Sequence, residues 1–463
     1  MRLHTHDYRT PDATGIVDGA ILMHREMSEL LSRHGSVTLH DLTTGPGCVS
    51  GVRGDEVVYA GSGPYAFLYH HWRQRHGGDH RIVREVHTAL WSGYWAQEEM
   101  CAPLTRPGDL VLFPTEYTRR LFLRHFPSLT EEGTAVSYPM LDRLPRRAPR
   151  PLPEPDRPLR IGYLGALSRA KNFDQVLSVF ARCHRETGGR VSLLCAGKPN
   201  AARWEADRVR AALREAGTSD ASVRIEGIWP QSRLAAFFDA IDVLLFPSTA
   251  SRETLGRVVL EALTHGVPVL AADVGPAVEL LPAGNLLPTT LETERTFDMG
   301  RVGPLGRVDE EELVSRLLTR DIAPASLRTE APYTEEAFLK ALAGNPVPAV
   351  TAHDHTLANA VRVAPRTDGT DPADDTERAT QLFRDFFERR DDKLARALDA
   401  LAARTGHDDP ALRRIVAAPQ RNLADYRAFP RLLDALVLPP LTYTLAAPAP
   451  GPAGPPHILR DAP

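Results

Sequence analysis

The sequence predicts a two-domain α/β protein in which helices cover parallel sheets. Its 463 residues exceed what one hydrophobic core usually supports. Short apolar runs alternate with amphipathic segments, most clearly from residue 158 to about residue 290. The proline-rich stretch LPRRAPRPLPEPDRP precedes this region and blocks regular structure. We therefore expect one domain at residues 1–150, a second at 151–345 and a C-terminal extension at 346–463.

The second domain shows the expected order of elements best. Strands are expected at the apolar runs LRIGYLG, RVSLLCAG, VRIEGI, DVLLFPS and PVLAAD. Helices are expected between them at FDQVLSVFARCHRET, EADRVRAALREAG, RLAAFFDA and RVVLEALTH. In the first of these helices, Phe173, Val176, Leu177 and Phe180 follow the spacing of a helix with one buried face. This alternation is typical of a parallel sheet with helices on both faces.

The rest of the chain gives weaker patterns. In the first 150 residues, strands are expected at MRLHTHD, SVTLHD, EVVYAG, RIVREVH and DLVLFPT, with an amphipathic helix at AILMHREMSELLSRHG. In the extension, apolar residues from Leu382 to Leu401 predict one helix that must pack on another element. The end, LAAPAPGPAGPPHILRDAP, is too rich in proline, glycine and alanine to build a core, so we expect a disordered or loosely attached tail.

Composition argues against several classes of protein. A net charge of -4 offers no strong field for nucleic acid. The four cysteines lie far apart and form no CxxC pair, so neither a zinc site nor a disulfide framework is indicated, and a reducing compartment fits. The sequence has neither a signal-peptide pattern nor an apolar run of transmembrane length, and we expect a soluble, cytoplasmic protein.

Two glutamates eight positions apart, Glu253 and Glu261, flank the expected start of a helix near Gly256. They follow the carboxyl end of a parallel strand, where open α/β sheets bind ligands. The unpaired N–H groups at a helix start favour a phosphate, and carboxylates accept hydrogen bonds from hydroxyls. The pattern therefore favours a nucleotide sugar as ligand. For Glu261 alone, a solvated ion pair with Arg257 is the competing interpretation.

The segment from Arg160 to Pro288 resembles the donor-binding half of a family 4 retaining glycosyltransferase of the GT-B type. The resemblance is carried, in chain order, by GYLGALSRAKN, LLCAG, VRIEG, LAAFFDAIDVLLFPS, ETLGRVVLE and ALTHGVPVLAADVG. It implies a GT-B fold, with two Rossmann-like domains facing across a cleft and a helical C-terminal extension. It also implies transfer of a glycosyl group, with retention, from a nucleotide-diphosphate sugar to a small-molecule, glycan or lipid-linked acceptor. No metal and no other cofactor are expected.

The resemblance also assigns roles to the residues of the E-x7-E motif. It implies that Glu253 contacts hydroxyls of the donor sugar and that Glu261 holds the ribose. Backbone amides of Thr254, Leu255 and Gly256 are expected to support the sugar and the diphosphate.

The loop ALSRAKN is expected to grip the leaving diphosphate. In the family, an arginine directly after the glycine and a lysine near the end of the loop do this. Lys171 fits the second role, but position 166 is alanine, so we expect Arg169 to reach the phosphates instead. For Arg169, a solvated loop arginine is the alternative.

The first domain contributes weaker candidates. Gly15 resembles part of the family's glycine loop facing the donor, although a glycine in a loop usually marks only a turn. His87 stands where family members often carry a histidine facing the donor sugar, although a lone histidine is commonly structural. Trp91, Tyr94 and Trp95 could stack on an acceptor, but such clusters are more often core.

Three alternatives stay open. The missing arginine at position 166 and the weaker first domain fit a catalytically inactive nucleotide-sugar-binding protein or partner subunit. A related enzyme that joins a nitrogen-bearing acceptor, without normal sugar chemistry, is a separate possibility. The segment with Arg119, Arg120 and Arg124 permits peripheral contact with a membrane, although a solvated helix face is the simpler interpretation.

Overall fold

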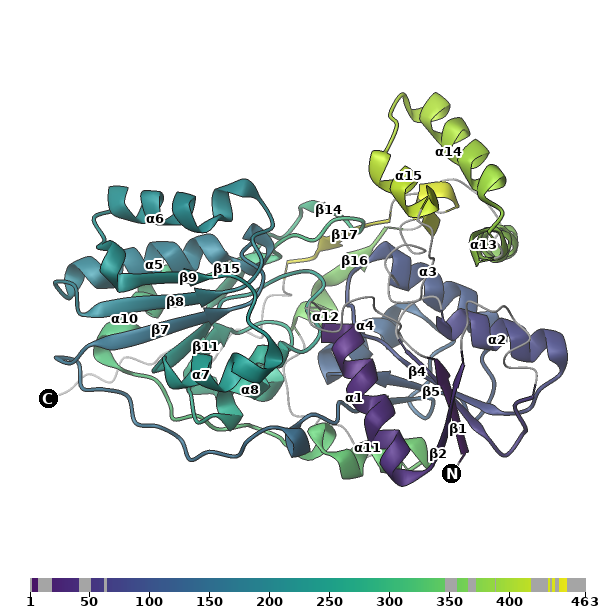
Figure 1. The fold of residues 1–463 in the computed structure, drawn as a ribbon, viewed down its shortest axis with the longest axis horizontal. Helices are drawn as coiled ribbons and strands as arrows, with labels where there is room; N and C mark the ends of the chain where they lie inside the picture. The colour runs from purple at the N-terminus through teal and green to yellow at the C-terminus, as the bar shows by residue number, and fades with distance from the viewer. Residues whose placement is uncertain are drawn as a thin grey trace, which may run out of the picture.

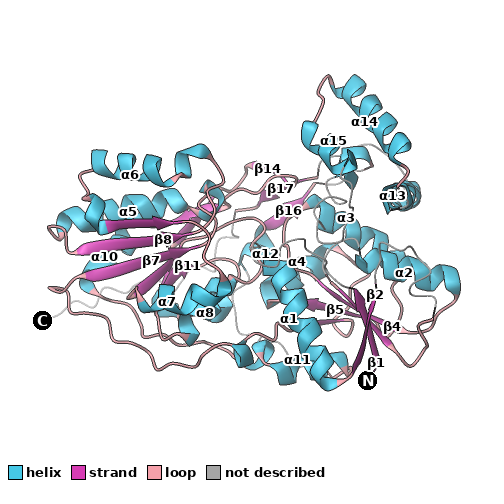
Figure 2. Cartoon of the chain, in the orientation of Figure 1, coloured by secondary structure: helices cyan, strands magenta, loops and turns pink. Residues whose placement is uncertain are grey.

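The computed structural model describes residues 2–6, 19–40, 51–61, 65–345, 356–364, 372–387, 389–417, 432–433, 435–437 and 441–447. Figures 1 and 2 show two α/β units side by side, with a group of C-terminal helices beside the first unit. The expected α/β class, with parallel sheets and covering helices, is confirmed.

The first unit is a six-stranded sheet in the order β2-β1-β3-β4-β5-β6, in which every pairing is parallel. Its strands are β1 (Arg2–His6), β2 (Ser36–His40), β3 (Val57–Ala60), β4 (Arg81–Glu85), β5 (Leu110–Phe113) and β6 (Thr134–Val136). Its helices are α1 (Gly19–His34), α2 (Tyr65–His76), α3 (Ser92–Cys101) and α4 (Glu116–His125). The sequence patterns did not indicate α2, α3 and β6.

The second unit is a six-stranded sheet in the order β12-β11-β10-β7-β8-β9, again parallel throughout. Its strands are β7 (Leu159–Leu164), β8 (Val191–Ala196), β9 (Val223–Glu226), β10 (Val243–Phe246), β11 (Val269–Ala272) and β12 (Leu286–Leu287). Its helices are α5 (Phe173–Glu186), α6 (Ala206–Glu215), α7 (Leu234–Asp239), α8 (Arg257–Thr264), α9 (Ala277–Leu280) and α10 (Glu310–Thr319). Every residue of β10 and β11 is buried, as expected for a sheet covered on both faces.

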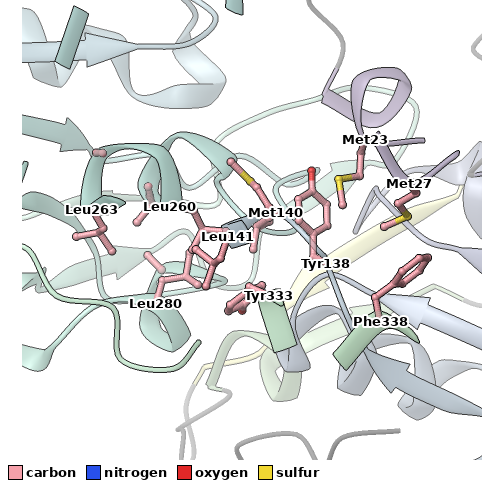
Figure 3. Close-up of a cluster of buried hydrophobic side chains, with 14 of the residues drawn as sticks. Met23, Met27, Tyr138, Met140, Leu141, Leu260, Leu263, Leu280, Tyr333 and Phe338 are labelled. Atoms are coloured by element: carbon pink, nitrogen blue, oxygen red, sulfur yellow. The ribbon is translucent and has the colours of Figure 1, made fainter. Parts of the chain in front are cut away.

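A hydrophobic cluster joins the two units (Figure 3). The segment after α10 returns to the first unit, where α11 (Glu335–Leu342) packs Phe338 edge-on against Tyr59, with ring centroids 5.8 Å apart. The N–H of Tyr138 and the carbonyl of Pro332 join the same regions at 2.9 Å. The side chains labelled in this cluster are Met23, Met27, Tyr138, Met140, Leu141, Leu260, Leu263, Leu280, Tyr333 and Phe338.

The C-terminal extension contacts both units. Strand β14 (Thr296–Asp298) of the second unit pairs with β17 (Thr442–Leu445), which also pairs with β16 (Val361–Val363). The expected loose tail is therefore wrong at its first residue, Leu445, which is buried in β17; residues 448–463 lie outside the described residues. The remaining elements are β13 (Thr289–Leu291), β15 (Gly306–Val308), α12 (Thr356–Ala360), α13 (Pro372–Phe387), α14 (Asp391–Thr405) and α15 (Pro410–Ala417).

The single helix expected between Leu382 and Leu401 is wrong, because α13 and α14 are separate helices. Arg389 lies between them with a φ of +60°, which a continuing helix does not permit. Apolar side chains from both helices, including Phe383 and Leu394, pack in one core with residues of α2 and α3. The shared core explains why the apolar spacing continues across the break.

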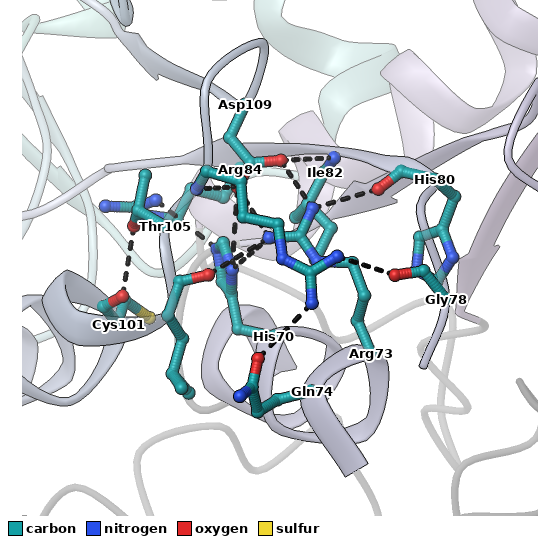
Figure 4. Close-up of polar contacts among 12 residues, drawn as sticks. His70, Arg73, Gln74, Gly78, His80, Ile82, Arg84, Cys101, Thr105 and Asp109 are labelled. Carbon is teal, nitrogen blue, oxygen red and sulfur yellow. Dashed lines mark hydrogen bonds and ion pairs between the residues drawn. The ribbon is translucent and has the colours of Figure 1, made fainter. Parts of the chain in front are cut away.

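Buried charges tie the elements of the first unit together (Figure 4). Arg84 on β4 donates to Glu98 on α3 at 2.6 Å, and Arg73 on α2 donates to both oxygens of Asp109 at 2.7 Å. His70 lies between the two guanidinium groups, and burial, followed by the charge of Arg84, lowers its pKa to about 3. These four charges are nearly inaccessible to water and must be compensated by one another.

The two units also meet at the N-terminus of α4. Glu279 on α9 accepts hydrogen bonds from the N–H groups of Glu116, at 2.8 Å, and Tyr117, at 2.6 Å. Burial raises the pKa of Glu279 from 4.5 to about 7, although the two N–H donors act in the opposite direction. Its carboxylate thus satisfies helix-start donors of the neighbouring unit.

Replacing Glu98→Ala is expected to destabilise the first unit by about 3–5 kcal/mol, because Arg84 is left as an unpaired buried charge. The measurement is the shift of the urea unfolding transition. As control, Asp207→Ala removes a fully exposed partner of Arg210 and should change stability by less than about 0.5 kcal/mol. Equal effects of the two substitutions would contradict a stabilising role for the buried pair.

Glu279 is expected to make stability fall as the pH rises from about 4.5 to about 7. In this window the unfolded chain has released the proton that the folded chain still holds on Glu279. The contribution of this proton to the free energy of unfolding is therefore complete below the window and lost above it. Unfolding midpoints measured across the window should show this slope in the unmodified chain and lack it in Glu279→Gln. The exposed control Glu132→Gln should keep the slope; a slope unchanged in Glu279→Gln would refute the assignment.

Candidate active site

The loop between β10 and α8 carries both glutamates and turns at Gly256. Gly256 directly precedes the first residue of α8 and has a φ of +73°, so the expected helix start is confirmed. A Cβ atom there would lie 2.9 Å from Cζ of Phe246, so both the backbone angle and the space favour glycine. The first turn of α8 leaves N–H groups without partners inside the helix.

Lys171 and Glu253 lie on loops that follow neighbouring strands, and they form an ion pair. Lys171 ends a short 3-10 helix, Arg169–Lys171, after β7, which pairs directly with β10. Its ammonium contacts Oε2 of Glu253, while Oε1 of Glu253 accepts from the N–H of Gly256 at 3.0 Å. The side chains are 29% and 15% exposed, so the pair is accessible to a ligand. A cation and a carboxylate therefore stand together at the start of α8.

Asn172 holds these two loops in place, a role that the sequence motifs did not reveal. It is fully buried in the left-handed conformation, with a φ of 53°. Its side-chain nitrogen lies 2.9 Å from the carbonyl oxygen of Pro247, 3.0 Å from Oγ1 of Thr249 and 3.0 Å from the carbonyl oxygen of Gly306. The residue next to Lys171 thus fixes the chain that leads to Glu253.

The structure does not test two further candidates. Arg169 is exposed at the start of the short 3-10 helix, and no ion pair between it and another described residue is formed. Its contact with a phosphate stays a prediction. Gly15 lies outside the described residues.

Glu261 is buried on α8 and bound by Arg257. Its Oε1 accepts from Nε of Arg257 at 3.0 Å and from the side-chain amide of Gln231 at 3.3 Å. The guanidinium of Arg257 also binds both oxygens of Glu26 on α1, at 2.8 and 3.0 Å. Burial alone would lower the pKa of Arg257, but Tyr138, Glu26 and Glu261 hold it above its ordinary value. The ion pair of Glu261 with Arg257 exists, but the competing interpretation of it as a solvated pair is wrong, because both side chains are largely buried.

His87 lies just after β4 and contacts a buried carboxylate. Its Nε2 is 3.1 Å from Oε2 of Glu85, and Nδ1 of His24 is 3.5 Å from the same oxygen. Burial alone would raise the pKa of Glu85, but His87 and then His24 bring it below its ordinary value. The carbonyl of His87 accepts from Oγ1 of Thr254 at 3.3 Å. Candidates from both units therefore meet at the carboxyl ends of β4 and β10.

Further contacts hold the loop between β10 and α8 against the first unit. Oγ1 of Thr115, the N-cap of α4, donates to the carbonyl of Thr254 at 2.7 Å. The N–H of Leu90 donates to the carbonyl of Ser251 at 3.1 Å. Thr254 and Leu255 are 7% and 3% exposed, so their side chains serve packing and docking, and only main-chain atoms are left for the support expected of them.

Trp91, Tyr94 and Trp95 belong to the core. They are 6%, 1% and 3% exposed and pack in apolar clusters. The guanidinium of Arg252 lies over the Trp91 ring at 4.6 Å. The structure therefore favours the core interpretation of these aromatic residues.

The arginines of α4 are bound within the chain. Arg119 is 8% exposed and pairs with Glu116 and Glu131, so the interpretation as a solvated face is wrong for this residue. Arg124 donates to the carbonyl of Asn359 at 2.7 Å. In the part of the chain that the structure describes, no helix is long and apolar enough to cross a membrane. Nor do His, Cys, Asp or Glu side chains of the described ranges gather in threes suited to a metal ion.

Residues 146–289 match the family model described as Glycosyl transferases group 1. Over 216 residues the chain is 31% identical to the 2-deoxystreptamine glucosyltransferase of Streptomyces kanamyceticus, covering 46% of this chain and 49% of that protein. Over 176 residues it is 27% identical to the D-inositol 3-phosphate glycosyltransferase of Corynebacterium aurimucosum, covering 36% and 41%. The chain thus spans less than half the length of these curated relatives.

The fold is similar to that of Anabaena HepE, solved in complex with UDP and glucose. The TM-score is 0.52 at 16% identity, and the match covers 74% of this chain and 98% of that one. This structural likeness agrees with the two six-stranded parallel sheets described above. The fold is therefore GT-B, and residues 146–289 are a domain of the glycosyl transferases group 1 family.

Proposed function

We propose that the chain is a family 4 retaining glycosyltransferase, which moves a glycosyl group from a nucleotide-diphosphate sugar to an acceptor hydroxyl. The observation that carries the proposal is the Lys171–Glu253 pair at the start of α8, with Glu261 on the same helix. The N-terminus of α8 and Lys171 supply positive charge for a diphosphate. Glu253 and Glu261 supply acceptors for hydroxyls of the sugar and the ribose.

The chemistry assigned to Lys171 is stabilisation of the leaving group. As the bond between the sugar and the diphosphate breaks, negative charge builds on the departing phosphate. An ammonium already held in position by Glu253 stabilises that charge without further reorganisation. The hydrogen bond from Oγ1 of Thr254 to the carbonyl of His87 joins the two units beside this pair.

The names of the relatives support a small polyhydroxylated acceptor. One relative is named for 2-deoxystreptamine and the other for D-inositol 3-phosphate. We therefore place a small-molecule acceptor ahead of a glycan or a lipid-linked one. Because the similar HepE structure contains UDP and glucose, UDP-glucose is the first donor to test.

The alternative is a nucleotide-sugar-binding protein without turnover. Ala166 favours it, because the arginine that the family carries after the glycine is absent. The exposed side chain of Arg169 is the candidate replacement. Turnover with any donor separates the two functions.

Lys171→Ala is expected to lower turnover at least about 100-fold, because one contact to the developing charge is lost. Glu253→Gln should also lower turnover, because it removes the partner that positions Lys171. The assay measures release of UDP from UDP-glucose with 2-deoxystreptamine or inositol 3-phosphate as acceptor. Lys340→Ala is the matched control, since Lys340 is half-exposed and pairs only with its helix neighbour Glu336 among the described residues.

Unchanged turnover in Lys171→Ala would contradict the role of Lys171. Binding of UDP without turnover across UDP-, GDP- and ADP-sugars would favour the inactive protein instead. Thermal unfolding of each variant shows whether a loss of turnover reflects a loss of fold.

A further inference from the structure

One guanidinium, that of Arg257, is shared between carboxylates of the two units. Nε binds Oε1 of Glu261, and the two terminal nitrogens bind both oxygens of Glu26. The side chains of Arg257, Glu26 and Glu261 are only 15%, 17% and 6% exposed, so the three charges interact with little screening by water. Glu26 and Arg257 are 231 residues apart in the sequence.

The two carboxylate oxygens of Glu261 differ in the number of hydrogen bonds that they accept. Arg257 and Gln231 both donate to Oε1. Within the described ranges, Oε2 of Glu261 forms no hydrogen bond that satisfies ordinary geometry with another residue. A ribose hydroxyl could therefore donate to Oε2 without displacing a protein donor.

Glu26 determines whether Oε2 of Glu261 is left free to accept a hydrogen bond from a ligand. A guanidinium binds a carboxylate best through two parallel hydrogen bonds. While Glu26 holds the edge formed by the two terminal nitrogens, Arg257 is oriented so that it donates to Glu261 through Nε alone. Without the charge of Glu26, Arg257 can turn and bind both oxygens of Glu261, which would then compete with a ribose.

We propose that Glu26 is a positioning residue, which acts through Arg257 to keep Glu261 open for the ribose of the donor nucleotide. The inference rests on the proposed function, because it assigns Glu261 to a ribose. It adds that the first unit, through α1, sets the affinity of the second unit for a nucleotide.

The test measures binding of UDP and of 2′,3′-dideoxy-UDP to the full chain by calorimetry. Glu26→Gln should weaken UDP binding about tenfold and leave the binding of the dideoxy compound unchanged, because that compound has no ribose hydroxyl for Glu261. Glu29→Gln is the matched control: Glu29 lies on the same helix, is 75% exposed and faces Arg143 at 3.5 Å, and its loss should change neither affinity.

A second variant distinguishes positioning from general damage. In Glu26→Gln/Arg257→Lys a cation still compensates the charge of Glu261, but an ammonium lacks the planar fork that binds both oxygens of a carboxylate. UDP should therefore bind more tightly to this variant than to Glu26→Gln alone. The side-chain amide of Gln231 also still donates to Glu261, so the variant is expected to fold. The ratio of the two affinities within one variant does not depend on how much of the sample is folded.

The inference is overturned if Glu26→Gln binds UDP as tightly as the unmodified chain, or if it weakens both nucleotides equally. Failure of Arg257→Lys to restore binding in the Glu26→Gln background would also overturn it. If the unmodified chain binds no UDP, GDP or ADP, the proposed function fails instead, and the two failures are thereby distinguished.

Discussion

The contact between Lys171 and Glu253 places opposite charges at the start of α8, and the proposed chemistry depends on it. A diphosphate beside two glutamates would be repelled unless each carboxylate had a nearby cation. The structure supplies one for each: Lys171 for Glu253, and Arg257 for Glu261. The two carboxylates can therefore accept hydroxyls next to a phosphate site. This compensation makes the E-x7-E spacing compatible with an anionic ligand.

The position of the site follows from the contacts between the two units. The loop after β10 reaches the first unit through Thr254, which contacts His87 after β4 and Thr115 at the start of α4. Glu279 binds the same end of α4 from the second unit. The hydrophobic cluster in Figure 3 packs beside these polar contacts. Residues of both units therefore contact the loop between β10 and α8.

Much of the fold and half of the site could be predicted because their signals are local. Each buried strand of the second unit is a short apolar run, and Gly256 marks the turn before α8. The resemblance assigned Lys171 and Glu253 separately to one donor site, and the structure brings the two side chains into contact. Contacts between distant residues gave no such signal: Glu26 and Arg257, or Glu279 and Tyr117, are ordinary charged or polar residues in their own segments. The break between α13 and α14 was missed because one core takes apolar residues from both helices.

The most direct measurement is a crystal structure of the chain with UDP bound. We expect the diphosphate at the start of α8, beside the N–H groups of residues 254–256, with Lys171 within hydrogen-bond distance and a ribose hydroxyl on Glu261. A nucleotide bound away from α8, or one whose phosphates do not contact Lys171, would contradict the proposed chemistry.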